Sequence, residues 1–200
     1  MAISRTLKGM RTASIGLGAN LPSKIGPPES TLAAAFARLE ELDAITACSS
    51  LYSTAPVGFA EQPRFLNAVV TLETELTPFQ LLGALLKIER EFGRDRLSAI
   101  PNGPRTLDLD ILLYDDFVIG GASLVIPHER LQTRAFVLVP LNEIAAHAID
   151  PRTGRSVSQL LKQYEGLFPN PHEALNAVVR IKSDLWQPVA AGGAADAGKS

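Results

Sequence analysis

The chain has 200 residues, of which 46% are hydrophobic and 20% charged, as in an ordinary soluble globular protein. Its formal net charge of −2 argues against a general polyanion binder, and its single cysteine, Cys48, excludes an intramolecular disulfide and a cysteine-rich metal site. No apolar run approaches the ~20 residues of a membrane span, and the first ten residues lack the apolar stretch of a secretory signal. We expect a single-domain cytoplasmic protein with neither a membrane nor a nucleic-acid partner.

Strand-like and helix-like segments alternate along the chain. The first strand carries Gly16 and Gly18 on one face, where the missing side chains let a neighbour approach closely. Thr77 is suited to cap the second helix and Gly93 to end it. This alternation predicts an α+β fold, a sandwich in which helices cover a mostly antiparallel sheet. The predicted strands are 12–19, 45–53, 65–73, 106–114 and short strands within 117–126, and the predicted helices are 28–42, 78–92, 134–146 and 156–164.

The segment GPRTLDLDILLYDD, residues 103–116, places two carboxylates on one strand. In an extended chain the alternating apolar residues from Leu107 to Leu113 share one face, whereas Asp108 and Asp110 project from the other, ~6.5–7 Å apart. Neighbouring carboxylates repel each other, a penalty that a divalent cation removes. Mg²⁺ usually takes one or two carboxylates together with substrate phosphates. The pattern favours a metal site over an amphipathic strand whose aspartates simply face water.

Arginines surround this segment in the sequence. A guanidinium binds phosphate oxygens in a bidentate fork, and a carboxylate-held metal with several arginines suits phosphoryl transfer. No P-loop is present, and GLGANL lacks the third glycine of a dinucleotide motif, so metal and arginine would have to hold a nucleotide. The arginines are Arg90, Arg94, Arg96, Arg105, Arg130 and Arg134, and Arg90 is better explained as a solvated helix-end residue.

Phe65 and Asn67 share the face of their strand that points away from its core. A ring can stack on a flat heterocycle, and an amide can donate and accept hydrogen bonds along its edge. Taken alone, the pair is better explained by a second small core with an amide at its rim, and Phe136 has the same ambiguity. His128 follows Pro127 at a strand-to-helix junction, where it could contact phosphate or cap a helix.

Six segments in order resemble one family: SIGLGANL, SSLYSTAPVG, QPRFLNAVV, IEREFGRDR, GPRTLDLDILLY and VIPHERLQTRAFVLVPL. From about Ala13 to Ile144 the chain is similar to 6-hydroxymethyl-7,8-dihydropterin pyrophosphokinase of folate biosynthesis. The resemblance implies a ferredoxin-like α/β sandwich and an ATP-dependent diphosphokinase that transfers pyrophosphate to the pterin hydroxymethyl oxygen and releases AMP. The pyrophosphokinase domain would span 11–165, with a C-terminal extension over 166–186 and flexible tails over 1–10 and 187–200.

The same resemblance implies roles for individual residues. Asp108 and Asp110 would bind two Mg²⁺ ions bridging the ATP phosphates, and with Arg94 and Arg105 they would form the catalytic group. The pterin would contact Asn20, Thr54, Val57, Phe65, Asn67 and Phe136. ATP would contact Glu89, Arg96, Ile111, Val125, His128 and Arg134.

Three residues depart from the family's pattern in the loops around the site. Ala55 stands where proline is frequent, Asn102 where tryptophan can stand, and Glu129 where tyrosine can stand. The implied partners are ATP and hydroxymethyldihydropterin, and docking to neighbouring folate-pathway enzymes stays open. Two rival interpretations are another Mg²⁺-dependent nucleotidyl or phosphoryl transferase and a non-catalytic ferredoxin-like ligand-binding module.

Overall fold

The computed structural model describes residues 9–59, 61–96, 101–168 and 177–189. Its main sheet has the strand order β10-β3-β4-β1-β5, with β2 also paired to β4, and every strand pair is antiparallel. Its strands are β1 (Arg11–Ala19), β2 (Ala44–Cys48), β3 (Leu51–Thr54), β4 (Phe65–Thr74), β5 (Asp108–Tyr114) and β10 (Val178–Ile181).

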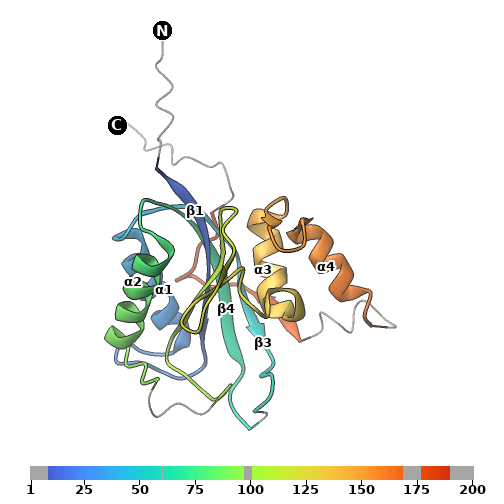
Figure 1. Cartoon of the computed structure of the whole chain (residues 1–200). Helices are drawn as coiled ribbons and strands as arrows, with labels where there is room; N and C mark the ends of the chain where they lie inside the picture. Colours follow the sequence, from blue (N-terminus) through green and yellow to red (C-terminus); the bar gives the residue numbers. More distant parts are fainter. Residues whose placement is uncertain (1–8, 60, 97–100, 169–176, 190–200) are drawn as a thin grey trace, which may run out of the picture.

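Helices cover both faces of this sheet, which confirms the predicted α+β sandwich. Figure 1 shows α1 and α2 on one side and α3, with α4 beside it, on the other. The helices are α1 (Pro28–Glu40), α2 (Pro78–Glu91), α3 (Ala135–Ala145) and α4 (Val157–Glu165), and the short elements are β6 (Ile119–Gly120), β7 (Val125–Ile126), η1 (Leu131–Thr133), β8 (Ile149–Asp150) and β9 (Arg155–Ser156).

The sheet separates two hydrophobic cores. Because side chains alternate along a strand, β4 sends Val70 and Leu72 to the core under α1 and α2 and Val69 to the core under α3 and α4. Burying an aliphatic side chain of this size contributes about 1.5–3 kcal/mol, so both helix layers are held firmly. Both faces of β4 are therefore apolar: Val70 and Leu72 lie on the predicted core face, and Val69 lies on the other face, in the second core.

The ends of α2 follow the sequence signals. Thr77 Oγ1 accepts a hydrogen bond from Gln80 N at 3.4 Å, and Gln80 Oε1 accepts one from Thr77 N at 2.9 Å, which completes a capping box. Gly93, at φ +82°, ends the helix in the left-handed conformation that glycine adopts without strain. This sharp stop sets the direction of the chain immediately before Arg94.

Two of the predicted strands differ from the structure. The single strand predicted over 45–53 is interrupted because the hydroxyl of Ser49 accepts from Val69 N at 2.9 Å, in place of a backbone carbonyl. In β5 the register with β1 shifts between Ser14 and Ile15, and Leu113 lies in the second core, not on the face of Leu109. The prediction that Leu113 shares that face is wrong.

The C-terminal segment adds structure that the sequence did not predict. β10 joins the main sheet, and β8 and β9 form a short hairpin before α4. Val189 and Cys48 exchange backbone hydrogen bonds of 2.8 and 2.9 Å, so the flexible tail predicted from residue 187 is wrong for 187–189. The remaining tail residues, 1–8 and 190–200, lie outside the described residues. Within the described part of the chain, no helix has the length and apolar character needed to span a membrane.

Candidate active site

Three cavities adjoin one another beside β5. The first, which we call the aromatic cavity, shares Asn67, Arg105, Arg134 and Phe136 with the second, the carboxylate cavity. The third, the outer cavity, shares Asp110 with the carboxylate cavity. The carboxylate cavity, with a volume of about 30 Å³, therefore lies between the other two and links them.

The aromatic cavity has a volume of about 160 Å³. This is smaller than the ~300–1,000 Å³ of sites for drug-sized ligands, and it suits one small flat molecule. The guanidinium of Arg105 lies over the Phe65 ring, 4.6 Å from its centroid, and Asn67 Nδ2 donates to Thr54 Oγ1 at 2.7 Å. Of the six residues predicted for the pterin, the five that line this cavity are Thr54, Val57, Phe65, Asn67 and Phe136.

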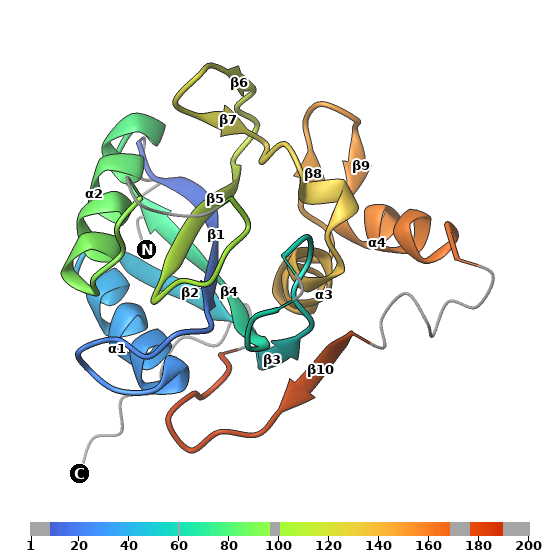
Figure 2. The same ribbon diagram turned by 90° about the horizontal axis from the view of Figure 1, so that it is seen from below.

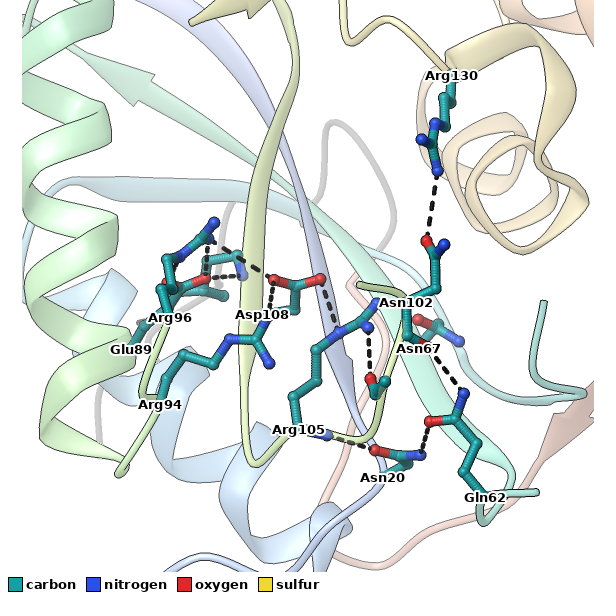
Figure 3. Close-up of polar contacts among 12 residues, drawn as sticks. Asn20, Gln62, Asn67, Glu89, Arg94, Arg96, Asn102, Arg105, Asp108 and Arg130 are labelled. Atoms are coloured by element: carbon teal, nitrogen blue, oxygen red, sulfur yellow. Dashed lines mark hydrogen bonds and ion pairs between the residues drawn. The ribbon is translucent and has the colours of Figure 1, made fainter. Parts of the chain in front are cut away.

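The sixth residue, Asn20, is not among the residues that line the cavity. It is 3% exposed, and its Oδ1 accepts from Arg105 N at 2.8 Å. Its Nδ2 donates to Gln62 Oε1 and to Pro63 O, both at 3.0 Å. Asn20 thus ties together the two loops that form the cavity wall, as Figure 3 shows for Arg105 and Gln62.

Asp108 and Asp110 both line the carboxylate cavity, so the prediction that they share one face of β5 is confirmed. They lie opposite Gly18 and Gly16 of β1, whose missing side chains let Asn67 and Leu112 approach the backbone closely. Burial, together with the charges of Asp108 and Glu89, raises the pKa of Asp110 to about 7. A buried carboxylate that other carboxylates repel is suited to a cation.

Three arginines surround Asp108 (Figure 3). Arg105 Nε lies 2.8 Å from Asp108 Oδ2, and the nearest nitrogens of Arg94 and Arg96 lie 3.7 Å from Oδ1. The Arg105 contact is an ion pair whose N–H is not aligned for a hydrogen bond. In the described part of the chain, the Nε atoms of Arg94 and Arg105 are therefore buried without a hydrogen-bond partner. Such donors fit an anionic ligand with several oxygens, as in a polyphosphate.

Glu89 holds other residues of the site in place, and its contact with ATP stays a prediction. It is 1% exposed, and its two oxygens accept from Arg96 Nε and Nη2, each at 2.7 Å. Glu89 Oε1 also accepts from Leu109 N at 2.8 Å, which connects the end of α2 to β5. Glu89 is not among the lining residues of any of the three cavities, so it orients Arg96 and the strand that carries the aspartates.

The outer cavity has a volume of about 280 Å³. Burial and the nearby charge of Arg134 lower the pKa of His128 to about 4, so its ring is neutral at pH 7. Because His128 Nδ1 accepts from Arg130 N at 3.1 Å, the ring proton lies on Nε2 and can be donated to a phosphate oxygen. Of the predicted ATP-side residues, those that line this cavity are Arg96, Ile111, Val125 and His128.

The last predicted ATP-side residue, Arg134, lines the aromatic and carboxylate cavities and not the outer one. Its guanidinium lies over Phe136, 5.3 Å from the ring centroid. Arg134 is therefore placed at the boundary between a flat ring and a charged group. Within 9–59, 61–96, 101–168 and 177–189 no cluster of three or more histidine, cysteine or acidic residues could hold a metal. Two carboxylates supplemented by substrate oxygens fit Mg²⁺ better than a site made by the protein alone.

Sequence reasoning missed the polar contacts that close the aromatic cavity. Gln62 Nε2 donates to Phe59 O at 2.7 Å and to Asn102 O at 2.9 Å, which joins the loop after β3 to the loop before β5. Arg130 Nη1 donates to Asn102 Oδ1 at 3.4 Å. These contacts have no periodic signal in the sequence. The departures from the family's pattern at Ala55 and Asn102 pointed to these loops but not to the contacts themselves.

Comparison with known proteins identifies the family to which this site belongs. A family model described as 7,8-dihydro-6-hydroxymethylpterin-pyrophosphokinase (HPPK) matches residues 14–146. The chain belongs to the HPPK family. Two relatives named 2-amino-4-hydroxy-6-hydroxymethyldihydropteridine pyrophosphokinase are similar over 155 residues each. The protein from Synechocystis sp. is 45% identical, covering 76% of both chains, and that from Haemophilus influenzae is 43% identical, covering 78% of this chain and 94% of the relative.

The fold matches solved structures of the same family. Wild-type HPPK-DHPS of Plasmodium falciparum, crystallised with STZ-DHP, aligns with a TM-score of 0.67 at 16% identity and covers 86% of this chain. This chain spans about half the length of that protein, since the alignment covers 45% of it. The likeness confirms the ferredoxin-like α+β fold of an HPPK domain. Another relative, the "Folate synthesis bifunctional protein, mitochondrial" of Arabidopsis thaliana, is 47% identical over 124 residues, which are 62% of this chain and 22% of that protein.

Proposed function

We propose that this HPPK-family chain transfers pyrophosphate from ATP to the hydroxymethyl oxygen of 6-hydroxymethyl-7,8-dihydropterin and releases AMP. The observation that carries the proposal is the position of Asp108 and Asp110 in a cavity that adjoins an aromatic cavity on one side and the outer cavity on the other. We place a flat pterin in the first and the nucleoside in the last. The ATP phosphates would lie beside the aspartates in the middle cavity, which has a volume of about 30 Å³ and must widen to admit them. Family membership identifies the pterin as the acceptor.

Each group of side chains supports a step of this reaction. Phe65 and Phe136 provide ring surfaces for the pterin, and Asn67 offers its amide to the heterocycle's edge. Arg105 lines the carboxylate cavity and has a buried Nε donor for a phosphate oxygen, which would offset the charge that develops as the phosphorus–oxygen bond breaks. Arg94 is not among the lining residues of the three cavities, and we propose that it acts from beside Asp108, 3.7 Å away. The contacts that join Gln62 and Asn102 hold the two loops together and exclude water, which would otherwise hydrolyse ATP.

We infer that Asp108 and Asp110 hold Mg²⁺, and we propose two ions. When bound, the metal supplies charge neutralisation on the phosphates and aligns them for in-line displacement. The raised pKa of Asp110, about 7, supports a cation at this position, because a bound ion would offset the repulsion between the carboxylates. Arg105 already contacts Asp108, so it is placed to shift its donors from that carboxylate to a phosphate oxygen.

The decisive experiment identifies the nucleotide product. The chain is incubated with ATP, Mg²⁺ and 6-hydroxymethyl-7,8-dihydropterin, and the nucleotides are separated by chromatography. We expect AMP in amounts equal to the pterin diphosphate. ADP would instead indicate a kinase that transfers a single phosphoryl group, which is the rival transferase. If no nucleotide is consumed and ligand binding does not depend on Mg²⁺, the chain is a non-catalytic binding module.

The domain bounds, cellular location and docking partners of the chain follow from the same proposal. We propose that the catalytic unit spans 11–165 and is followed by an extension over 166–186, whose described strand β10 pairs with β3. We place the chain in the cytoplasm, where ATP is supplied and where a lone thiol such as Cys48 stays reduced. Docking to a neighbouring folate-pathway enzyme is supported by relatives that carry this region within a bifunctional protein.

A further inference from the structure

The segment 177–189, which we call the C-terminal strap, lies outside residues 14–146 that the family model matches. Its strand β10 nevertheless forms the end of the main sheet and runs antiparallel to β3 (Figure 2). Farther along, Trp186 is 5% exposed, and its Nε1 donates to Ser49 O at 2.8 Å. The indole packs edge-on against Phe36 of α1, with ring centroids 5.5 Å apart. The strap is thus anchored in the core and not loosely attached.

The first described residue of the strap contacts the loop that forms the aromatic cavity. The carbonyl of Ala177 accepts from Ala55 N at 3.1 Å and from Arg64 Nη2 at 3.1 Å. Arg64 also donates from Nε to Ser53 Oγ at 2.9 Å and from Nη2 to Ser53 O at 3.1 Å. One guanidinium therefore joins the end of β3, the start of β4 and the strap.

These contacts fix two residues of the aromatic cavity. Ser53 precedes Thr54, and Arg64 precedes Phe65, while Thr54 and Phe65 lie opposite each other in the register of β3 and β4. Both line the cavity, and Thr54 Oγ1 also accepts from Asn67. Arg64 itself is exposed and is not among the lining residues of the cavity. Arg64 therefore lies outside the part of the site where the reacting atoms would meet.

We propose that Arg64, together with the C-terminal strap, is a positioning residue for the flat-ring subsite: it sets the separation of Thr54 and Phe65 by joining both strand ends to Ala177. The inference rests on the proposed function, since it concerns the acceptor's binding. It extends the site to a part of the chain that the family model does not cover. The guanidinium is suited to this role because its planar fork reaches several acceptors at once, whereas an ammonium is a single point.

The test compares the full-length chain with R64A, R64K and R180A, by measuring AMP formation over a range of pterin and ATP concentrations. We expect R64A to raise the KM for the pterin about fivefold, as three exposed hydrogen bonds are lost, with kcat and the KM for ATP within about twofold. The KM of R64K for the pterin should lie between those of R64A and the unmodified chain. Arg180 is the matched control because it is a strap arginine that pairs with Glu143 at 3.7 Å, and R180A should leave the pterin KM unchanged.

An unchanged pterin KM in R64A overturns the proposal, and so does an equal fall in apparent affinity for both substrates. If R64A fails to fold, the same comparison is made with R64K and S53A, for which an unchanged pterin KM is equally contradictory. A second readout is independent of activity. Hydrogen exchange at the amide of Ala55 should be faster in R64A than in the unmodified chain, and equal exchange rates would show that Arg64 does not hold this loop against Ala177. If the unmodified chain forms no AMP, the proposed function fails, and this exchange measurement alone decides whether Arg64 positions the loop.

Discussion

A Cβ atom on residue 18 would lie 2.9 Å from Asn67 Oδ1, so Gly18 of β1 and the amide of Asn67 on β4 occupy adjoining space. We predict that Gly18→Ala displaces this amide from the aromatic cavity. Pterin affinity should fall about tenfold, the size expected when one polar contact to a ligand is lost. Calorimetric titration with a pterin in the presence of a non-hydrolysable ATP analogue measures the change.

Gly83 provides the control for that substitution. A Cβ atom there meets nothing within 4 Å, so Gly83→Ala should leave pterin binding unchanged. It should also raise the free energy of unfolding by about 0.5–1 kcal/mol, because residue 83 lies within α2. Equal pterin affinity in Gly18→Ala and the unmodified chain would show that Asn67 does not contact the ligand.

Asp110→Asn should separate activity from stability. The variant keeps the shape of the side chain but loses a metal ligand, and AMP formation should fall by about a hundredfold or more. The free energy of unfolding should stay equal or rise, since the substitution removes the repulsion that raises the pKa of Asp110 to about 7. Asp116→Asn, at an exposed position just after β5, is the control and should keep full activity. An active Asp110→Asn enzyme would rule out the assigned metal site.

Removal of divalent cations should stop the reaction without unfolding the protein. Three arginines lie within 4 Å of Asp108, so residues of the protein itself compensate its charge. With EDTA present, AMP formation should cease while the Tm changes by less than about 2 °C. Added Mg²⁺ should restore activity. A fall in Tm of several degrees would instead indicate a structural metal.

His128 should make the protein less stable as the pH falls. Its pKa is about 4 in the folded chain and 6.5 in the unfolded chain, so between these values the unfolded chain binds more protons at this residue. The free energy of unfolding should therefore decline through this window. From pH 7 to pH 5 His128 should account for about 1–2 kcal/mol, allowing for its partial exposure.

Urea titrations of the unmodified chain and His128→Gln at both pH values test this assignment. The raised pKa of Asp110 acts in the opposite direction, because it lowers stability as the pH rises toward 7. The contribution of His128 is therefore the difference between the two chains in how the free energy of unfolding changes with pH. Identical pH dependence in both would show that His128 does not titrate differently in the folded protein.

Local patterns in the sequence predicted the parts of the fold that local physics determines. Strand alternation placed Asp108 and Asp110 on one face, and the capping residues located both ends of α2. The register shift in β5 was not predictable, because it depends on how β1 pairs with its neighbour. The same limit applies to β10, whose short run Val178–Ile181 forms a strand by pairing along the whole length of β3.

In the candidate site, too, some residues could be predicted from the sequence, whereas others depend on partners far away in the chain. Residue types and their order brought out the aspartates and the arginines, whereas the family resemblance supplied the pterin and the role of Phe65. That Asn20 and Glu89 support other residues could be recognised only once their hydrogen-bond partners, distant in sequence, were seen. Gln62 and Arg64 lie in a loop of turn-forming residues, where no periodicity marks a functional side chain.

Trp186 is the single tryptophan of the sequence, and it is buried between Phe36 and the backbone of Ser49. Intrinsic fluorescence excited at the indole band consequently reports the docking of the chain's C-terminal part against α1. An emission change on adding substrate would be a signal transmitted from the catalytic face to the opposite side of the sheet, where Trp186 lies in the core with α1. Unchanged emission would not mean that no substrate had bound.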